Sequence, residues 1–357
     1  MVQVAGGSNP VSSVGEFKLI DGISKLLASS RVRSSGLVLG VGDDTAIWQP
    51  RPGRAITITT DTLVESVHFR RDWSDAQQIG HRALAVNLSD LAAMGSRPRT
   101  AVISLGLRGS EQDRWVYDVY RGMLALAQRW HVRIAGGDIV HSPKALTIGV
   151  TAHGELRSAE QALRRDQARS GDIIAVTGPL GLAAAGVRLL SEGRHGIDGA
   201  PAMLTAHRLP QPRILHGMLL ARAGVRCAMD LSDGLFGDLP KILQASEVSA
   251  RVEMDKLPIP SSLRWTFPDW FELGTRGGED FELLFTAPPE VFEHVTTVFR
   301  RCRLRPPIAI GTVTAPGKGG PQLTLRDSAL RRRVIEPGAF DHFAAKPKPQ
   351  ANGRTGG

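Results

Sequence analysis

The sequence predicts a two-domain protein in which helices and β-strands are mixed within each domain. The chain has 357 residues, which is enough for two domains of ordinary size. Strand-like and long helix-like periodicities occur in both halves. Residues 154–171 are polar, arginine-rich and weakly periodic, so we place the domain boundary near Gly154. The expected organisation is a flexible N-terminus (1–13), an N-terminal domain (14–154), a C-terminal domain (155–344) and a disordered tail (345–357).

The composition is that of an ordinary globular protein, with 42% hydrophobic and 22% charged residues. Two cysteines cannot make a disulfide framework or a four-thiolate zinc site, and their scarcity fits a reducing compartment. No apolar run approaches the length of a membrane span, and the first residues lack the features of a signal peptide. We therefore expect a cytoplasmic protein without membrane contact.

The formal net charge is +9, which suits either a nucleic-acid partner or anionic small substrates. Aromatic residues make up only 5% of the chain and do not interleave with the arginines. The aromatic signature of ribonucleoprotein domains is also missing. We expect no nucleic-acid partner, and a basic nucleic-acid-binding protein is kept as a remote alternative.

The N-terminal half begins with an amphipathic helix over residues 15–27, where apolar residues recur at helical spacing. Short strands follow at 37–39 and 46–48, and a hairpin across 51–53 leads into a strand. In that strand Ile56 and Ile58 alternate with threonines, which predicts one buried face, and Thr59, Thr60 and Asp61 come at its end. Residues 81–95 are apolar nearly all round and predict a buried helix. The remaining expected elements are strands at 100–107, 132–135 and 145–153 and a helix at 111–130.

The C-terminal half continues the mixture of strands and helices. Residues 193–212 are rich in glycine, proline and histidine, which predicts that this stretch is mostly loop. The expected strands are at 173–177, 227–231, 251–254, 281–285, 308–312 and 322–325, and the expected helices at 182–190, 213–223, 235–243, 267–273 and 289–300.

Acidic residues occur repeatedly in junctions flanked by glycine, serine or threonine: Asp43 and Asp44, Asp61, Asp90, Asp138, Asp230 and Asp233, and Glu279 and Asp280. Any one of them, taken alone, would serve as a turn or helix-cap residue. Together they indicate a site for Mg²⁺ and phosphate, because Mg²⁺ takes carboxylate oxygens together with substrate phosphates. Asp61 is the expected centre of this site.

Several common catalytic motifs are missing from the sequence. It contains no P-loop of the form GxxxxGKS or GxxxxGKT, no GxGxxG that opens a helix, no HExxH and no GxSxG. His68 is the histidine embedded in the acidic motifs, and the alternative for it is a partly exposed residue at a strand end. These absences direct attention to the carboxylates.

A series of motifs carries a family resemblance: GVGDDTA (40–46), TTDTLVESVHF (59–69), AVNLSDLAAMG (85–95), GGD (136–138), MDLSDGLFGDL (229–239), GGEDFELLF (277–285) and FDHF (340–343). With this order and spacing the chain resembles the thiamine-monophosphate kinases over residues 15–343. Enzymes of the same superfamily, such as aminoimidazole ribonucleotide synthetase and selenophosphate synthetase, do not usually carry TTDTLVE–VHF and NLSDLAAMG together.

The resemblance implies an α+β fold of the aminoimidazole ribonucleotide synthetase-like type. In that fold an N-terminal sheet domain binds ATP and Mg²⁺ and dimerises, and a C-terminal α+β domain follows. The implied reaction is ATP-dependent phosphorylation of thiamine monophosphate to thiamine diphosphate, the last step of thiamine diphosphate biosynthesis. ATP as co-substrate, several Mg²⁺ ions and a second copy of the chain are the implied partners. The alternative is another ATP-dependent enzyme of the same superfamily.

The motifs also imply roles for individual residues. Asp61, Asp90 and Asp233 would be central to catalysis. The Mg²⁺ ligands would be Asp44, Thr59, Thr60, Asp61, Asp90, Asp138, Asp230 and Asp233. ATP would contact Gly137, Asp138, Arg165 and Ser232, and the acceptor would contact His68, Glu279 and Phe340. The chain departs from the family pattern at Ser66 (usually glycine), Ile139 (usually threonine) and Phe340 (usually tyrosine or tryptophan), and the choice of Arg165 over Arg164 depends on the alignment.

The implied chemistry suits these residue types. A phosphate monoester has a second pKa near ~6, so at neutral pH the acceptor is already an anionic nucleophile and needs no general base. The obstacle is repulsion between two polyanions, which metal-bound carboxylates and positioning would overcome. An active site rich in aspartate and poor in histidine, cysteine and lysine is consistent with that demand.

Overall fold

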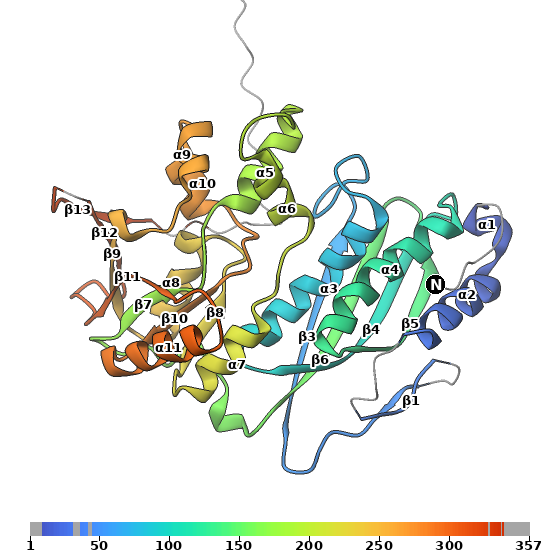
Figure 1. Cartoon of the computed structure of the whole chain (residues 1–357), viewed down its shortest axis with the longest axis horizontal. Coiled ribbons are helices and arrows are strands. Elements are labelled where there is room, and N and C mark those ends of the chain that lie inside the picture. The colour runs from blue at the N-terminus through green and yellow to red at the C-terminus, as the bar shows by residue number, and fades with distance from the viewer. Residues whose placement is uncertain (1–8, 31–35, 42–44, 328, 337, 339–357) are drawn as a thin grey trace, which may run out of the picture.

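The computed structural model describes residues 9–30, 36–41, 45–327, 329–336 and 338. Asp44, Phe340 and the expected tail (345–357) lie outside this part of the chain. Two large sheets, each with its own helices, and a small sheet of two strands form the described part of the molecule, with the N-terminal half on the right and the C-terminal half on the left of Figure 1. This is the expected α+β fold with two sheet-containing halves.

The first sheet has four strands in the order β3-β6-β4-β5. Their bounds are β3 (Ala55–Val64), β6 (Thr147–Leu156), β4 (Arg97–Leu107) and β5 (Arg133–His141). β4 and β5 run parallel, and the other pairs are antiparallel. Two long helices, α3 (Ala76–Ala93) and α4 (Asp113–Trp130), lie over one face of this sheet (Figure 1). The motif GGD lies inside β5, not after a strand as expected, because β5 pairs with β4 through Asp138 and beyond.

α3 and α4 approach each other closely through two glycines. A Cβ on Gly80 would lie 1.9 Å from the carbonyl oxygen of Val119, and a Cβ on Gly122 would lie 1.9 Å from that of Gln77. Real side-chain atoms do not approach a backbone oxygen so closely, so both positions require glycine at this crossing. The close crossing positions the buried helix that carries Asp90.

The alternation along β3 is as expected, but the buried and exposed faces are exchanged. Ile56 and Ile58 are 45% and 67% exposed, whereas Thr57, Thr59 and Asp61 are partly buried on the other face. The reason is that α3 packs against the face that carries the threonines and Asp61. Asp61 also lies within the strand, which continues to Val64, and not at its end.

The first described residues form small elements beside this sheet: α1 (Val11–Val14), α2 (Glu16–Ala28), β1 (Leu37–Leu39) and β2 (Ile47–Trp48). The expectation of a flexible segment over 1–13 is wrong for its last residues. The amides of Val11 and Ser12 donate to the carbonyls of Glu111 and Gly109. The expected hairpin across 51–53 is also wrong, because β2 pairs with β1 while β3 pairs with β6.

The second sheet has seven strands in the order β13-β12-β9-β11-β7-β10-β8. Their bounds are β7 (Ile173–Val176), β8 (Cys227–Asp230), β9 (Ser249–Glu253), β10 (Leu283–Ala287), β11 (Ile308–Thr314), β12 (Leu323–Arg326) and β13 (Arg332–Ile335). β12 runs parallel to β9, and the other pairs are antiparallel.

The helices around the second sheet are α5 (Leu182–Glu192), α6 (Ala200–Arg208), α7 (Ile214–Arg222), α8 (Leu235–Ala245), α9 (Ser261–Thr266), α10 (Trp270–Arg276) and α11 (Pro289–Arg301). Two short 3₁₀ turns are Ala159–Gln161 and Met254–Lys256. The expected helix over 267–273 is instead the pair α9 and α10, with Phe267 extended between them.

α6 overturns the expectation of a loop over 193–212. Glycine and proline at both ends of the stretch suggested loop, yet Pro201 occupies the first turn of α6, where a proline fits. Ala200, Met203 and His207 are buried, and a Cβ on Gly186 of α5 would lie 2.3 Å from the carbonyl oxygen of Met203. Tertiary packing against α5 thus stabilises a helix of weak sequence signal.

The two halves share one apolar core. α3 packs against α7, and a Cβ on Gly217 of α7 would lie 1.9 Å from the carbonyl oxygen of Ala92. Buried residues from both halves, such as Leu88, Leu220 and Phe285, belong to this single cluster. None of the helices in the described part of the chain has the length and apolar character needed to cross a lipid bilayer.

Candidate active site

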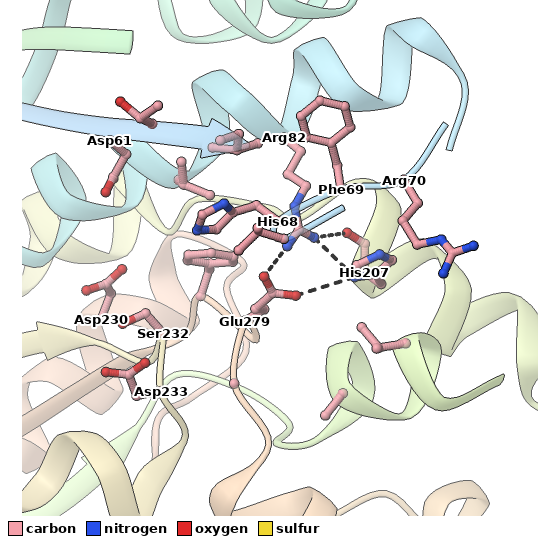
Figure 2. Close-up of a pocket in the computed structure, with 18 of the residues that line it drawn as sticks. Asp61, His68, Phe69, Arg70, Arg82, His207, Asp230, Ser232, Asp233 and Glu279 are labelled. Atoms are coloured by element: carbon pink, nitrogen blue, oxygen red, sulfur yellow. Dashed lines mark hydrogen bonds and ion pairs between the residues drawn. The ribbon is translucent and has the colours of Figure 1, made fainter. Parts of the chain in front are cut away.

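A cavity of about 850 Å³ lies between the two halves and is lined from both of them. β3, α3 and the turn after β3 supply one side, and α5, α6, the SDG turn and the GGED loop supply the other (Figure 2). The structure brings half of the expected site residues to this cavity: Asp61, His68, Asp90, Asp230, Ser232, Asp233 and Glu279.

Asp61 of β3 and Asp90 of α3 face each other in the cavity. Burial, with a further contribution from the Asp90 carboxylate, raises the pKa of Asp61 to about 6. Burial also raises the pKa of Asp90, against the effect of the Thr59 hydroxyl, which donates to Asp90 Oδ2 at 2.5 Å. Thr59 thus acts on the site through Asp90. Two carboxylates held this close favour a cation between them.

Asp230, at the end of β8, brings a third carboxylate from the C-terminal half. It is 4% exposed and accepts a hydrogen bond from Ser89 Oγ of α3 at 2.7 Å. Burial, followed by the charge of Asp90, raises its pKa to about 7. A buried carboxylate beside another acid is costly unless a cation is nearby. The charge of Arg165 opposes this rise at both Asp90 and Asp230.

The donor set fits Mg²⁺ held by a few carboxylates and by phosphate oxygens. Within the described residues no three histidine, cysteine or acidic side chains are close enough to form a complete protein cage for a metal. Mg²⁺ does not need such a cage, because it usually binds through one or two carboxylates, waters and substrate phosphates. Asp61 and Asp90, whose pKa values are raised by burial, are suitable oxygen ligands for it.

The SDG turn is held by a buried aspartate that the sequence reasoning missed. Asp238 Oδ2 accepts hydrogen bonds from the backbone amides of Ser232 and Asp233, each at 2.9 Å. Lys241 Nζ lies 2.6 Å from Asp233 Oδ2 and 2.8 Å from Asp238 Oδ1. Asp233 therefore enters the site as half of an ion pair. Asp238 lies in the motif MDLSDGLFGDL, five residues after Asp233. Its position in the first turn of the helix after the SDG turn could have predicted that it binds the backbone of that turn.

The turn after β3 places His68 in the cavity. His68 Nδ1 accepts a hydrogen bond from the backbone amide of Val64 at 3.0 Å, which fixes the ring against the end of the strand. Ser66 has a φ of +68°, the left-handed conformation in which glycine is favoured. Ser66 stands where the family pattern usually has glycine, and its backbone adopts the conformation that glycine favours. The serine therefore strains this turn.

Glu279 is held by two residues that the sequence reasoning also missed. The Arg82 guanidinium donates to Glu279 Oε1, and His207 Nδ1 lies 3.4 Å from Glu279 Oε2 (Figure 2). Burial alone would raise the pKa of Glu279, but Arg82 and His207 outweigh it and lower the pKa to about 2. Arg82 lies in a helix whose sequence is mostly apolar, and a charged residue in such a helix predicts a buried partner of opposite charge. No sequence pattern pointed to His207, because the stretch that contains it was expected to be a loop.

A second cavity of about 740 Å³ contains three of the expected residues that are absent from the first one. Thr60, Gly137 and Asp138 line it, on the sheet face opposite α3 and α4. Successive side chains of a strand point to opposite faces, and Thr60 lines this cavity whereas Asp61 lines the first one. Thr62 lines both cavities.

The remaining expected residues lie apart from both cavities or outside the described chain. Arg164 is paired with Asp166 at 2.5 Å, whereas the charge of Arg165 acts on Asp90 and Asp230. Asp44 and Phe340 lie outside the described residues, so their expected roles stay predictions.

Comparisons with known proteins agree with this architecture. The model of the N-terminal domain of AIR synthase related proteins matches residues 42–156, and that of their C-terminal domain matches residues 169–324. The thiamine-monophosphate kinase of Bacillus subtilis is 34% identical over 331 residues, which cover 92% of this chain and 99% of that protein.

Solved structures show the same relationship. The crystal structure of thiamine-monophosphate kinase from Stenotrophomonas maltophilia is 36% identical, with a TM-score of 0.76, over 87% of this chain and 96% of that one. The structure of AaThiL complexed with AMPPCP and TMP is 30% identical, with a TM-score of 0.71, over 95% of this chain and 100% of that one.

Proposed function

The chain belongs to the thiamine-monophosphate kinase family, and from this premise we propose how its cavity phosphorylates thiamine monophosphate. The reaction is the transfer of the γ-phosphoryl group of ATP to thiamine monophosphate, which gives thiamine diphosphate and ADP. The relatives named above are kinases, so the other ATP-dependent enzymes of the superfamily are not favoured as models for this chain.

The observation that carries the proposal is the convergence of buried and partly buried carboxylates from both halves on one cavity. Asp61 and Asp90 come from the N-terminal half, and Asp230 and Asp233 come from the other. Two polyanions react only if their repulsion is removed, and the acceptor phosphate needs no base to deprotonate it. A cavity that collects cations through carboxylates supplies that function.

We assign Mg²⁺ to these carboxylates. When bound, Mg²⁺ would neutralise the phosphate charges of ATP and of the acceptor. Asp61, Asp90, Asp230 and Asp233 would share the ions of the main cavity, with one or two carboxylates to an ion, and Thr59 would orient Asp90 through its hydroxyl. Thr60 and Asp138 in the second cavity, with Asp44, complete the proposed ligand set, which can hold several ions.

The remaining residues divide between the two substrates. Gly137, Asp138, Arg165 and Ser232 would bind ATP, and the positive charge of Arg165 near Asp90 and Asp230 supports its place beside phosphates. His68 and Glu279 line the main cavity and would bind the acceptor, together with Phe340. Glu279 would face the cationic thiamine head.

The test is a product assay with purified protein, ATP, Mg²⁺ and thiamine monophosphate. We expect thiamine diphosphate and ADP in equal amounts, and no product when EDTA removes the metal. Release of inorganic phosphate without thiamine diphosphate would instead indicate an enzyme that activates an amide or acyl oxygen, and would refute the proposal.

We further propose that the exposed face of the first sheet forms a homodimer interface. Ile56 and Ile58 on the edge strand β3 are 45% and 67% exposed, and Val140 on the opposite edge strand β5 is 49% exposed. Large apolar side chains exposed on a sheet face are typical of interaction surfaces. Sedimentation should show a dimer for the wild type and a monomer for Ile58→Asp; a wild-type monomer would refute this part.

The division into domains at 14–154 and 155–344 and the cytoplasmic location also stay proposals. The two large sheets, which use residues 55–156 and 173–335, support two domains, but Gly154 lies inside β6, so we place the boundary after Leu156. Both cysteines are free thiols in the structure, which supports a reducing compartment. Limited proteolysis between the sheets and cell fractionation would test these two points.

A further inference from the structure

Arg82, His207 and Glu279 form a connected group at one end of the main cavity, here called the inter-domain network. Arg82 comes from α3, His207 from α6 and Glu279 from the loop before β10. Arg82 and His207 are 4% and 5% exposed. The group therefore joins the two halves of the molecule beside the expected acceptor site, and its interpretation here depends on the proposed kinase function.

Each oxygen of the Glu279 carboxylate faces one partner. Arg82 Nη2 donates to Oε1, and His207 Nδ1 lies 3.4 Å from Oε2. Arg82 Nη1 donates to the carbonyl oxygen of His207 at 2.7 Å and lies 3.1 Å from His207 Nδ1. The dashed lines in Figure 2 mark these contacts. His207 holds Oε2 in the tautomer that carries the proton on Nδ1, and Arg82 then donates to the His207 carbonyl oxygen and to Oε1.

Stability alone is a poor explanation for this arrangement. The Arg82 side chain is 5% exposed and that of Glu279 is 33% exposed. Desolvation of the arginine offsets much of what the ion pair gains, and solvent screens the glutamate. Arg82 Nε is buried and lacks a hydrogen-bond partner among the described residues, which adds to the cost. Glu279 and Phe281 have φ values of +72° and +49°, which strain the loop that presents the carboxylate to the cavity.

The desolvation of Arg82 and the strain of the loop occur at a place where substrate binding would require a carboxylate held in one orientation. Arg82, His207 and Glu279 all line the cavity that contains Asp61, Asp90 and Asp230. Arg82 also lies on the same helix as Asp90, so the helix that carries a proposed metal ligand carries the partner of Glu279 as well. Displacement of a binding group by about 1 Å can cost a large part of its effect.

We propose that Arg82 and His207 are positioning residues that act through Glu279 to bind the acceptor, a phosphate monoester with a cationic heteroaromatic head. Arg82 fixes Oε1 from the first half of the molecule, and His207 fixes Oε2 from the second. Binding of the acceptor therefore requires both halves in the arrangement seen here. Of the residues proposed to bind ATP, Ser232 contacts Glu279 through the backbone, where the Glu279 amide donates to the Ser232 carbonyl oxygen at 2.9 Å. The Glu279 carboxylate takes no part in that bond, so we expect ATP binding to depend little on Arg82 and His207.

The test compares steady-state kinetics of Arg82→Lys with those of the wild type. Lysine keeps the charge but cannot reach two partners in the fork geometry of arginine. We expect the KM for thiamine monophosphate to rise about tenfold or more, with the KM for ATP changed less than twofold. Thiamine monophosphate, which should raise the Tm of the wild type, should raise that of the variant much less at the same concentration.

The matched control is Arg99→Lys. Arg99 is 7% exposed and pairs with Glu155 at 2.8 Å, but neither residue lines either cavity. This variant should lower the Tm and leave both KM values within twofold of the wild type. If Arg82→Lys behaves like this control, or if it raises both KM values equally, the network is structural and the inference is wrong.

A second pair of variants tests the network if Arg82→Lys does not fold. His207→Leu removes the contact with Glu279 Oε2 and should raise the acceptor KM about threefold to tenfold. His207→Asn retains a polar atom near the position of Nδ1 and should recover most of the loss. Equal acceptor KM values for His207→Leu and the wild type would refute the inference. A wild-type enzyme that makes no thiamine diphosphate would refute the proposed function instead.

Discussion

Replacement of Asp230 by asparagine should stabilise the metal-free protein while it abolishes activity. The Asp230 carboxylate is buried, and its pKa is raised from 3.8 to about 7. A group with a raised pKa in the folded state contributes its stability at pH values below the unfolded pKa. That stability is lost as the pH rises through the folded pKa. Ionised Asp230 therefore destabilises the folded protein at neutral and alkaline pH.

The size of the effect follows from the two pKa values. With a pKa of 3.8 in the unfolded chain and about 7 in the folded protein, Asp230 lowers the free energy of unfolding by about 4 kcal/mol at pH 8 and by about 2 kcal/mol at pH 5.5. Part of the rise in pKa comes from repulsion by Asp90. We therefore expect the difference in free energy of unfolding between Asp230→Asn and the wild type to grow by about 1–2 kcal/mol from pH 5.5 to pH 8. The asparagine oxygen can still accept the hydrogen bond from Ser89, so that contact is kept.

The assay is urea denaturation of the wild type and Asp230→Asn at pH 5.5 and pH 8, in EDTA. Asp166→Asn is the control, because the hydrogen bond from Arg164 lowers the pKa of Asp166 and its removal should not stabilise the protein as pH rises. Added Mg²⁺ should then stabilise the wild type more than Asp230→Asn. If Asp230→Asn is less stable than the wild type at pH 8 in EDTA, or if its advantage does not grow with pH, the reasoning from burial is wrong.

Three other changes test separate parts of the structure. Asp61→Asn should reduce kcat by about two orders of magnitude or more, since it removes a proposed metal ligand, and the Tm in EDTA at neutral pH should not fall, because burial raises the pKa of Asp61 as well. Near-wild-type turnover would make Asp61 a structural residue. Ser66→Gly should raise the free energy of unfolding by up to about 1 kcal/mol in urea titrations, because it relieves a φ of +68°. Gly122→Ala should cost about 2–4 kcal/mol, visible as a lower Tm, because its Cβ would lie 1.9 Å from the Gln77 carbonyl oxygen; an unchanged Tm would show that the helices separate easily.

The acidic motifs were readable from the sequence because each combines a chemical type with a local backbone context. A carboxylate beside glycine, serine or threonine after an apolar run can be recognised without knowledge of the fold. Asp61, Asp90, Asp230 and Asp233 were expected at one site, and the structure places all four along one cavity.

Other residues of the cavity could not be found in this way. Arg82 lies in a helix that reads as apolar, and His207 lies in a helix that reads as loop. Their importance depends on contacts with Glu279, which is far away in the chain. No local pattern encodes a contact of that kind.

The sequence by itself determined the class of fold, most of the helices and strands, the carboxylates and the family, because these depend on periodicity and residue type. The tertiary structure alone decided which face of each element is buried. It exposed Ile56 and Ile58, directed Thr60 and Asp61 into different cavities, and joined Arg82 to Glu279 across the two halves. The physical reason is that a strand has two faces of similar composition, and only the helix packed against one of them determines which becomes the interior.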